Sequence, residues 1–217
     1  ISVFWSPPVT ESCLEMTNPV KLVPIVMSVL FAFVATLLTT SPAVAQNEEP
    51  ALPEVRFVTT EGSFVLQLRP DVAPKTVENF LAYVNSGFYD GTIFHRVIPG
   101  FMVQAGGFDE NLGRKQTRAP IVNEATRTLP NLRGTIAMAR TNAPDSATSQ
   151  FFINVANNDF LNAGVRGPGY AVFGKVTEGM GVIDRIAGVQ TGYQRGMADV
   201  PVSPVIIESA EEITKDN

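Results

Sequence analysis

The chain has 217 residues, of which 45% are hydrophobic and 17% charged, and its formal net charge is −5. This length allows one globular domain with a sizeable core, and the composition excludes wholesale disorder. The negative charge argues against a nucleic-acid partner, because phosphate binding needs a basic face. One Cys and one His exclude a disulfide within this sequence, a thiolate zinc site and a His-rich metal site, and we expect no metal and no cofactor.

The N-terminal region has the features of an export signal. Residues 22–38 form an apolar run without a charged side chain, Lys21 stands directly before it, and a small-x-small sequence ends at Ala45. We therefore predict a signal peptide over residues 16–45 that is cleaved after Ala45 and directs the protein to the periplasm. Secretion is one alternative. An uncleaved membrane anchor is the other, because the apolar run is near the lower length limit for a spanning helix.

Residues 1–15 do not suit a basic leader, because they include two acidic residues, and Met16 is a better start. We interpret residues 1–15 as an upstream, non-native extension. Trp5 and Cys13 both lie in it. The predicted mature chain therefore has no thiol, which suits an oxidising compartment.

The predicted domain covers residues 55–213, between a polar, proline-bearing linker at 46–54 and a short tail at 214–217. Its first part alternates between apolar and polar side chains over residues 55–59 and 63–68. A turn with a glycine separates the two runs. This pattern predicts a β-hairpin.

An amphipathic helix is predicted over residues 73–86, where apolar side chains recur at helical spacing, with Pro74 in the first turn and Gly87 at the end. Further β-like runs are expected at 92–98, 101–104, 134–139, 151–155, 171–176 and 205–209, and a second short helix at 181–187. Many strands, two helices and no repeated βαβ unit predict a β-barrel or sandwich with helical caps.

One connection, residues 106–133, is long, polar and weakly periodic. Connections of this length are uncommon in compact domains and are often functional. Arg114, Lys115 and Arg118 form a small basic cluster within it. We interpret the cluster as a solvated loop face in preference to a phosphate site.

Conventional catalytic machinery is scarce. His95 is the single imidazole, and it lies in the apolar run IFHRV, so a packed His is a better interpretation than a catalytic base. The serines at 146 and 149 do not lie in a nucleophile elbow. The glycine-rich segments lack the helix-opening context of phosphate loops. The sequence therefore offers no convincing machinery for proton transfer.

Three motifs carry a resemblance instead. Residues 94–107 read FHRVIPGFMVQAGG, and they are followed by SQFFI at 149–153 and YAVFGKV at 170–176. Together they resemble the signatures of the cyclophilin family of peptidyl-prolyl cis-trans isomerases, over roughly residues 55–210. The segment ARTNAPDSATSQFFINV and Tyr170 are most similar to the periplasmic bacterial branch.

The resemblance implies a mainly β fold, a closed eight-stranded antiparallel β-barrel capped by two α-helices. It also implies an enzyme that accelerates rotation about X-Pro bonds during the folding of exported proteins. Rotation about a peptide bond breaks no bond, so the scarcity of bases and nucleophiles is no obstacle. The expected partners are proline-containing unfolded or extended polypeptides, with no stable membrane anchor after cleavage.

The resemblance also implies the site residues. Arg96 matches the catalytic Arg that donates to the prolyl nitrogen, and Gln104 matches a polar position that supports it. The implied proline pocket is apolar, and the strand that pairs with the peptide backbone includes positions 139 and 140. The substrate-binding residues are expected to be Phe101, Met102, Ala139, Arg140, Gln150, Phe152, Phe160, Leu161 and Tyr170.

Two departures from the family pattern matter. Cyclosporin-sensitive relatives often carry Trp at the position of Phe160, and Phe has no indole N–H to donate, so we expect weak cyclosporin binding. Tyr170 replaces a His of many relatives and changes the rim of the pocket.

Two other function classes stay open at this point. The domain could be a proline-peptide-binding chaperone module with little turnover, or a barrel that carries a small apolar ligand. Arg96 and Gln104, together with the Phe pair, favour catalysis over both.

Overall fold

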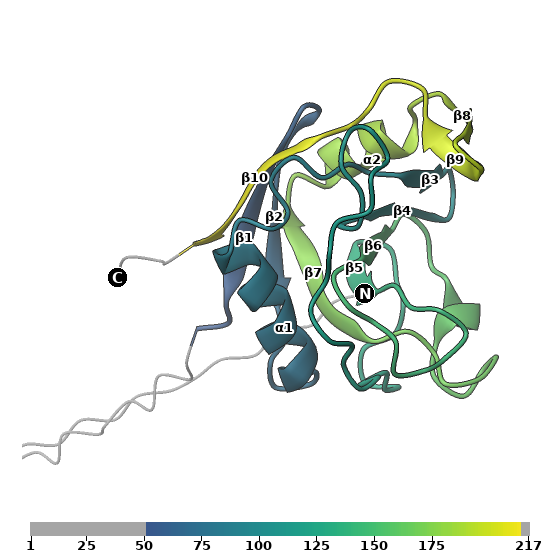
Figure 1. The fold of residues 1–217 in the computed structure, drawn as a ribbon. Coiled ribbons are helices and arrows are strands. Elements are labelled where there is room, and N and C mark those ends of the chain that lie inside the picture. Colours follow the sequence, from purple (N-terminus) through teal and green to yellow (C-terminus); the bar gives the residue numbers. More distant parts are fainter. Residues whose placement is uncertain (1–50, 214–217) are drawn as a thin grey trace, which may run out of the picture. The chain divides into compact units, whose positions relative to one another are not determined.

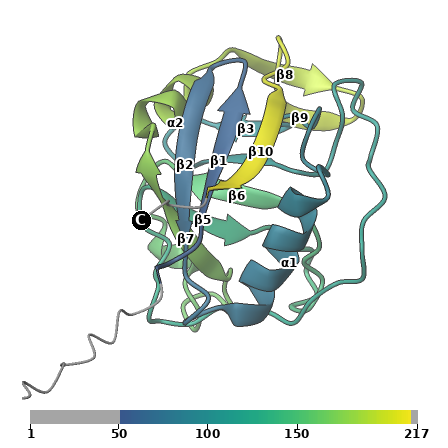
Figure 2. The same ribbon diagram turned by 90° about the vertical axis from the view of Figure 1, so that its left-hand side faces the viewer.

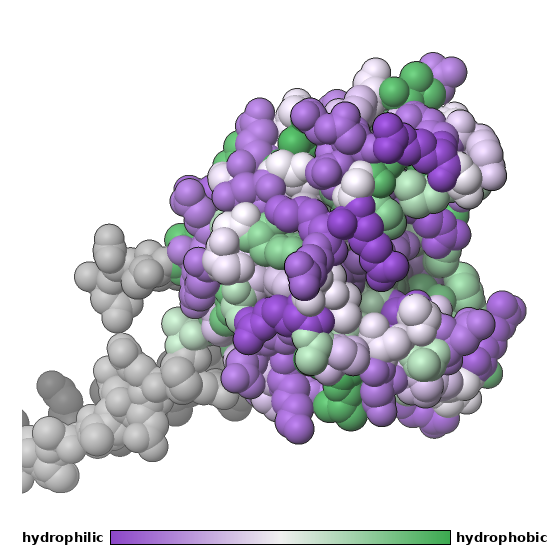
Figure 3. Space-filling view, in the orientation of Figure 1, coloured by the Kyte–Doolittle hydropathy of each residue, from purple (hydrophilic) through white to green (hydrophobic). Residues whose placement is uncertain are grey.

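A computed structural model describes residues 51–213 of the chain. The predicted extension at 1–15, the signal peptide at 16–45, the tail at 214–217 and most of the linker lie outside the described residues. Within residues 51–213, no helix is long and apolar enough to cross a membrane. The face of this part that is turned to the viewer in Figure 3 is mostly hydrophilic, with hydrophobic residues scattered over it.

The first two strands, β1 (Glu54–Thr59) and β2 (Gly62–Leu68), form the predicted hairpin. They pair antiparallel without a register shift, and Thr59 stands opposite Gly62. Gly62 has φ +119°, a conformation that side chains other than glycine rarely adopt. The Thr59 hydroxyl donates to the Gly62 carbonyl oxygen over 2.7 Å and accepts from the Glu61 N–H over 3.1 Å, so this one side chain stabilises the turn.

Helix α1 (Pro74–Asn85) confirms the first predicted helix. Its N-cap, Ala73, has no side chain that can accept from the free N–H groups of the first turn. The carboxylate of Glu124 takes this role, because it accepts from the backbone N–H groups of Lys75 over 3.2 Å and Thr76 over 2.8 Å. The long connection thus caps the helix from a distance.

Eight strands form one curved antiparallel sheet in the order β10-β1-β2-β7-β5-β6-β4-β3 (Figure 1). Helix α2 (Met180–Ala187), the second predicted helix, lies at the opposite end of this sheet from α1 in Figure 2, and both helices contribute to the same main core. The remaining strands of the sheet are β3 (Arg96–Ile98), β4 (Met102–Ala105), β5 (Thr135–Met138), β6 (Phe151–Asn154), β7 (Val172–Glu178) and β10 (Ile207–Ile213).

The prediction of a closed barrel is too strong. The two edge strands, β3 and β10, do not pair as a ladder in the described residues. The segments before them meet through a single bridge between Ile93 and Ile206, and the N–H of Phe94 donates to the carbonyl of Val205 over 2.9 Å. The fold is therefore a mainly β half-barrel with two helices, because within residues 51–213 no ladder of hydrogen bonds joins the edge strands β3 and β10.

The two faces of the sheet carry two different apolar clusters. Side chains alternate between faces along a strand, so Val103 and Ile153 point inward into the main core. That core is rich in aromatic contacts, such as the stacked rings of Phe57 and Phe64, whose centroids are 5.1 Å apart. A second cluster lies on the outer face of β4, β5, β6 and β7 and consists of Met102, Ala137, Phe152 and Val172.

A second hairpin, β8 (Thr191–Gln194) and β9 (Met197–Pro201), was not predicted. Its sequence mixes glycine with polar residues and shows no clear alternation. Arg195 and Asp199 have φ +47° and +61°, so irregular backbone interrupts the strand pattern. The hairpin packs against β3 and so borders the outer face of the sheet.

The long connection at 106–133 contains no helix or strand, as predicted. Arg114 and Arg118 of its basic cluster are exposed, as a solvated loop face requires, whereas Lys115 is half-buried. The ammonium group of Lys115 donates to the carbonyl of Phe88 and lies 4.7 Å from the centre of the Phe88 ring. The backbone N–H of Arg118 donates to the Tyr83 hydroxyl over 2.8 Å. These residues tie the connection to the end of α1.

Candidate active site

One row of side chains crosses four neighbouring strands on the outer face. Arg96 on β3 stands opposite Gln104 on β4, Gln104 stands opposite Phe152 on β6, and Phe152 stands opposite Ala137 on β5. Residues directly opposite each other in antiparallel strands point to the same side. The row therefore runs from a charged end at β3 to an apolar end at β5.

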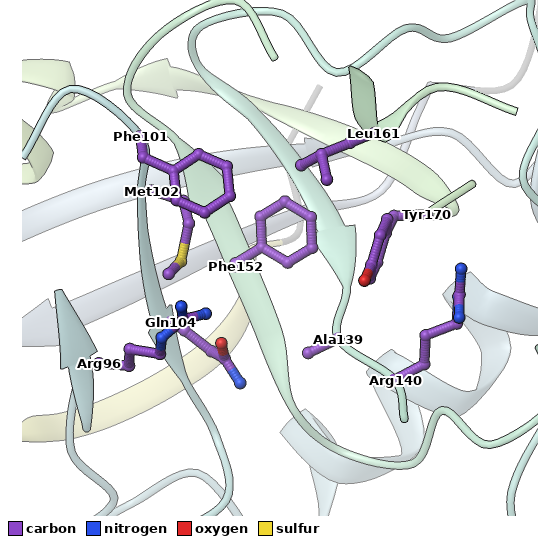
Figure 4. A pocket seen from close by; sticks show the side chains of 9 residues that line it. All are labelled: Arg96, Phe101, Met102, Gln104, Ala139, Arg140, Phe152, Leu161 and Tyr170. Atoms are coloured by element: carbon purple, nitrogen blue, oxygen red, sulfur yellow. The ribbon is translucent and has the colours of Figure 1, made fainter. Parts of the chain in front are cut away.

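A cavity of about 120 Å³ opens over this row (Figure 4). Phe152 lies at its centre, with Phe101 and Met102 on one side and Tyr170 on the other. Nine of the eleven predicted site residues line the cavity: Arg96, Phe101, Met102, Gln104, Ala139, Arg140, Phe152, Leu161 and Tyr170. Met102 and Phe152 are only 2% and 4% exposed, so the floor is apolar and firmly packed.

Arg96 projects from the sheet edge, and its side chain is 44% exposed. Its Nε lies 3.8 Å from a carboxylate oxygen of Asp199 on β9. Sequence reasoning missed this partner, because Asp199 lies far along the chain in a hairpin that no pattern predicted. A guanidinium held in this way presents several coplanar N–H donors to the cavity.

Gln104 is oriented by Gln150. The Gln104 side-chain amide donates to the Gln150 side-chain oxygen over 2.9 Å. Gln150 does not line the cavity itself, so it acts there through Gln104. The contact depends on Gly107, where an added Cβ would come within 2.6 Å of the Gln150 side chain.

Phe160 is the other predicted residue that lies outside the cavity lining. It belongs to a short 3-10 helix, η1 (Asp159–Leu161), and is 38% exposed. Its ring stacks on that of Phe101, with centroids 5.6 Å apart and an interplanar angle of 29°. Phe160 therefore supports one wall of the cavity from behind.

The backbone at 139–140 is only partly available to a peptide. The Ala139 N–H already donates to the carbonyl of Gln150 over 2.9 Å. The Arg140 N–H makes no hydrogen bond with another described residue. Of the backbone N–H groups at these two positions, that of Arg140 is therefore the one available to a peptide.

His95 does not line the proline cavity. It is 4% exposed, and its ring lies 4.7 Å from that of Phe108. Burial lowers its pKa to about 4, although contacts with the Ile93 backbone and the Gln150 side chain partly oppose this. The imidazole is neutral at neutral pH, as expected of a packed histidine. Within residues 51–213, no group of three acidic, His or Cys side chains could hold a metal.

The sequence of this domain matches one known family. Residues 54–212 match the family described as cyclophilin type peptidyl-prolyl cis-trans isomerase/CLD. The chain belongs to the cyclophilin family. It is thus an enzyme of the peptidyl-prolyl cis-trans isomerase class, and the row from Arg96 to Phe152 lies in the domain that defines this class.

Three bacterial proteins named as peptidyl-prolyl cis-trans isomerases are similar to this chain over nearly the whole of their own length. Peptidyl-prolyl cis-trans isomerase cyp18 of Streptomyces antibioticus is 61% identical over 160 residues, which are 72% of this chain and 96% of the relative. Peptidyl-prolyl cis-trans isomerase A of Dickeya dadantii is 54% identical over 182 residues, 84% of this chain and 94% of the relative. Isomerase B of Escherichia coli is 55% identical over 158 residues, 71% and 96% of the two chains.

Solved structures agree with this cyclophilin fold. A cyclophilin type isomerase of Cryptosporidium parvum has a TM-score of 0.64 and 27% identity, and the match covers 76% of this chain and 99% of that one. The cyclophilin AquaCyp293 of Hirschia baltica has a TM-score of 0.61 and 26% identity over 75% of this chain and 74% of that one.

Proposed function

We propose that this cyclophilin accelerates X-Pro rotation through a hydrogen bond from Arg96 to the prolyl nitrogen, while the proline ring occupies the apolar cavity. One observation carries the proposal. The cavity has the Arg96 guanidinium at one end, next to a buried apolar floor of Met102 and Phe152. A proline residue has the same two parts, an amide nitrogen and an apolar ring.

The chemistry follows from amide resonance. Rotation about a planar peptide bond faces a barrier of about 18–20 kcal/mol. At the twisted geometry the prolyl nitrogen regains a lone pair that can accept a hydrogen bond. A fixed donor therefore stabilises the twisted state more than either planar state, and differential stabilisation of this kind lowers the barrier. In this scheme Gln104 is held by Gln150 and positions the substrate and Arg96.

The proposed substrate is an extended segment of a proline-containing polypeptide. The free N–H of Arg140 is available for a main-chain hydrogen bond, which is how extended peptides are held beside a sheet. A crystal structure of the Cryptosporidium parvum relative was determined in the presence of the dipeptide Ala-Pro. This likeness supports a proline-containing ligand for the cavity.

A protease-coupled isomerase assay on an Ala-Pro peptide tests the activity and its mechanism together. Arg96→Ala removes the proposed donor and is expected to lower kcat/KM by about 100-fold, the usual effect of losing a preorganised donor. Arg56→Ala removes an exposed arginine from strand β1 and serves as the matched control. Equal kcat/KM values for wild type and Arg96→Ala would refute the proposed mechanism.

We also propose that the protein acts on exported proteins in the periplasm, after cleavage of the signal peptide at 16–45. The apolar run and the small-x-small sequence ending at Ala45 support this proposal. N-terminal sequencing of the protein from the cell envelope is expected to begin at Gln46. A mature protein that keeps residues of the 22–38 run would contradict it.

Weak cyclosporin binding belongs to the same proposal. The exposed ring of Phe160 offers apolar surface beside the cavity, without the N–H donor that an indole would add.

A further inference from the structure

A second cavity adjoins the proline cavity. It has a volume of about 320 Å³, and Arg140, Leu161 and Tyr170 line both cavities. The two spaces are therefore neighbours across the side chains of Leu161 and Tyr170. A polypeptide with its proline in the first cavity has adjacent residues within reach of the second, since an extended chain advances by about 3.3–3.6 Å per residue.

Two arginines form the charged part of the second cavity, and each lies on an aromatic ring. The guanidinium carbon of Arg166 is 5.2 Å from the centre of the Phe160 ring. That of Arg140 is 4.4 Å from the centre of the Tyr170 ring. Stacking on a ring uses the flat face of a guanidinium and leaves the N–H groups at its edge free to donate.

Neither guanidinium is neutralised by a direct partner. Within residues 51–213, neither arginine forms an ion pair. Arg140 donates through Nε to the Gly169 carbonyl over 3.0 Å and through Nη1 to the Thr141 carbonyl over 2.9 Å, and its Nη2 has no partner in this part of the chain. The Arg166 side chain donates to no other described residue. Asp159, which precedes Phe160 in the chain, accepts from the side-chain amide of Asn162 over 3.5 Å and does not line the second cavity.

Hydrogen bonds and close packing stabilise the loop that carries Arg166. The N–H of Gly164 donates to the carbonyl of Gly167 over 2.8 Å, which closes a turn around Arg166. The side-chain amide of Asn123 donates to the Gly169 carbonyl over 3.1 Å. Gly169 has φ +74°, and a Cβ there would lie 2.5 Å from the nitrogen of Ala163, so the loop packs tightly on itself.

We infer that the second cavity binds an acidic side chain of the same polypeptide whose proline occupies the first cavity. The guanidinium of Arg166 and the Nη2 group of Arg140 offer N–H donors for the two oxygens of a carboxylate, and Asp or Glu is the residue that supplies one. The enzyme then prefers X-Pro sites with an Asp or Glu within three residues of the proline. This inference rests on the proposed isomerase function and defines its substrate class.

The preference is measured by two-dimensional exchange NMR on peptides with an Ala-Pro core, which needs no coupling protease. Glu and Gln are compared at each of the two positions before the core and the three positions after it, all of which lie within three residues of the proline. At one position at least, Glu is expected to raise kcat/KM by about two- to fivefold at low salt, as exposed charge pairs do. The difference should shrink as the ionic strength rises, because salt screens exposed charges.

Arg166→Gln is the decisive variant, and Arg118→Gln, which removes an exposed arginine from the long connection, is its charge-matched control. The ratio of Glu to Gln rates should fall to about one in Arg166→Gln and should stay at the wild-type value in Arg118→Gln. A ratio that survives in Arg166→Gln, or is lost equally in both variants, overturns the inference.

The remaining outcomes separate the inference from the function on which it rests. Equal rates for Glu and Gln peptides at every position, with the neutral peptides still exchanging, overturn the acidic preference and leave the isomerase intact. Absence of exchange on every peptide overturns the mechanism instead. In that case the peptide affinities from the same spectra decide the preference, and equal affinities for Glu and Gln peptides overturn it too.

Discussion

The buried imidazole of His95 should make the folded state lose stability as the pH falls from 6.5 towards 4. Its pKa is about 4 in the folded protein, chiefly because burial disfavours the charged ring. In the unfolded chain it returns to the ordinary value of 6.5. Between these two values the unfolded state binds a proton that the folded state does not.

The sign and size of the effect follow by linkage. Stability rises with pH wherever the unfolded state holds more protons, so the contribution of His95 is fully present above pH 6.5 and is lost as the pH falls towards 4. At about 1.4 kcal/mol for each pH unit, the whole loss amounts to about 3 kcal/mol. The exposed carboxylates of Asp71 and Asp184 have pKa values lowered by their arginine partners, so they titrate below this window.

Urea unfolding followed by circular dichroism at a series of pH values measures the loss. His95→Gln removes the titrating ring, and the free energy of unfolding of this variant should be nearly flat between pH 6.5 and 4.5. Equal pH slopes for wild type and variant would refute the reasoning. If the variant does not fold, NMR titration of the single histidine of the chain decides the matter, and a pKa near 6.5 in the folded protein would refute it as well.

Three further changes test the burial of the cavity floor, the weakness of an exposed ion pair and the binding of cyclosporin. Phe152→Ala removes a ring that is 4% exposed and should lower the free energy of unfolding by about 3–5 kcal/mol in urea titrations; a loss below about 1 kcal/mol would contradict its burial. Arg133→Gln breaks a 2.8 Å ion pair with Asp184 in which both side chains are nearly half exposed. The same titration should therefore show that the free energy of unfolding falls by less than about 1 kcal/mol, and a larger fall would contradict this prediction. Phe160→Trp adds an N–H donor and should tighten cyclosporin binding in a fluorescence titration, whereas unchanged affinity would defeat the expectation.

Local patterns predicted the elements that obey one period throughout. The apolar side chains of 73–86 recur at helical spacing, and the observed helix differs from this range by one residue at each end. The hairpin from Glu54 to Leu68 was also predicted, although its second strand has three buried apolar residues in a row, at 64–66. The β8–β9 hairpin was missed, because left-handed residues such as Asp199 break the alternation and its position depends on packing against β3.

The family resemblance predicted which residues belong to the site, but the register between the strands decides how their side chains are arranged. Nothing local to Phe152 distinguishes it from Phe151, its neighbour in the strand. Phe151 points into the main core and Phe152 into the outer cluster, so a register shift of one residue would exchange them. The contact of Arg96 with Asp199 likewise joins segments far apart in sequence, and no spacing rule could have predicted it.

The central claim is that Arg96 stabilises the twisted peptide bond rather than the bound peptide. Exchange NMR on one Ala-Pro peptide gives both the dissociation constant and the rate of bound-state interconversion for wild type and Arg96→Ala. The account predicts that the interconversion rate falls by about 100-fold while the dissociation constant changes by only a few fold. An interconversion rate that stays at the wild-type value in Arg96→Ala, whatever the change in affinity, would contradict it.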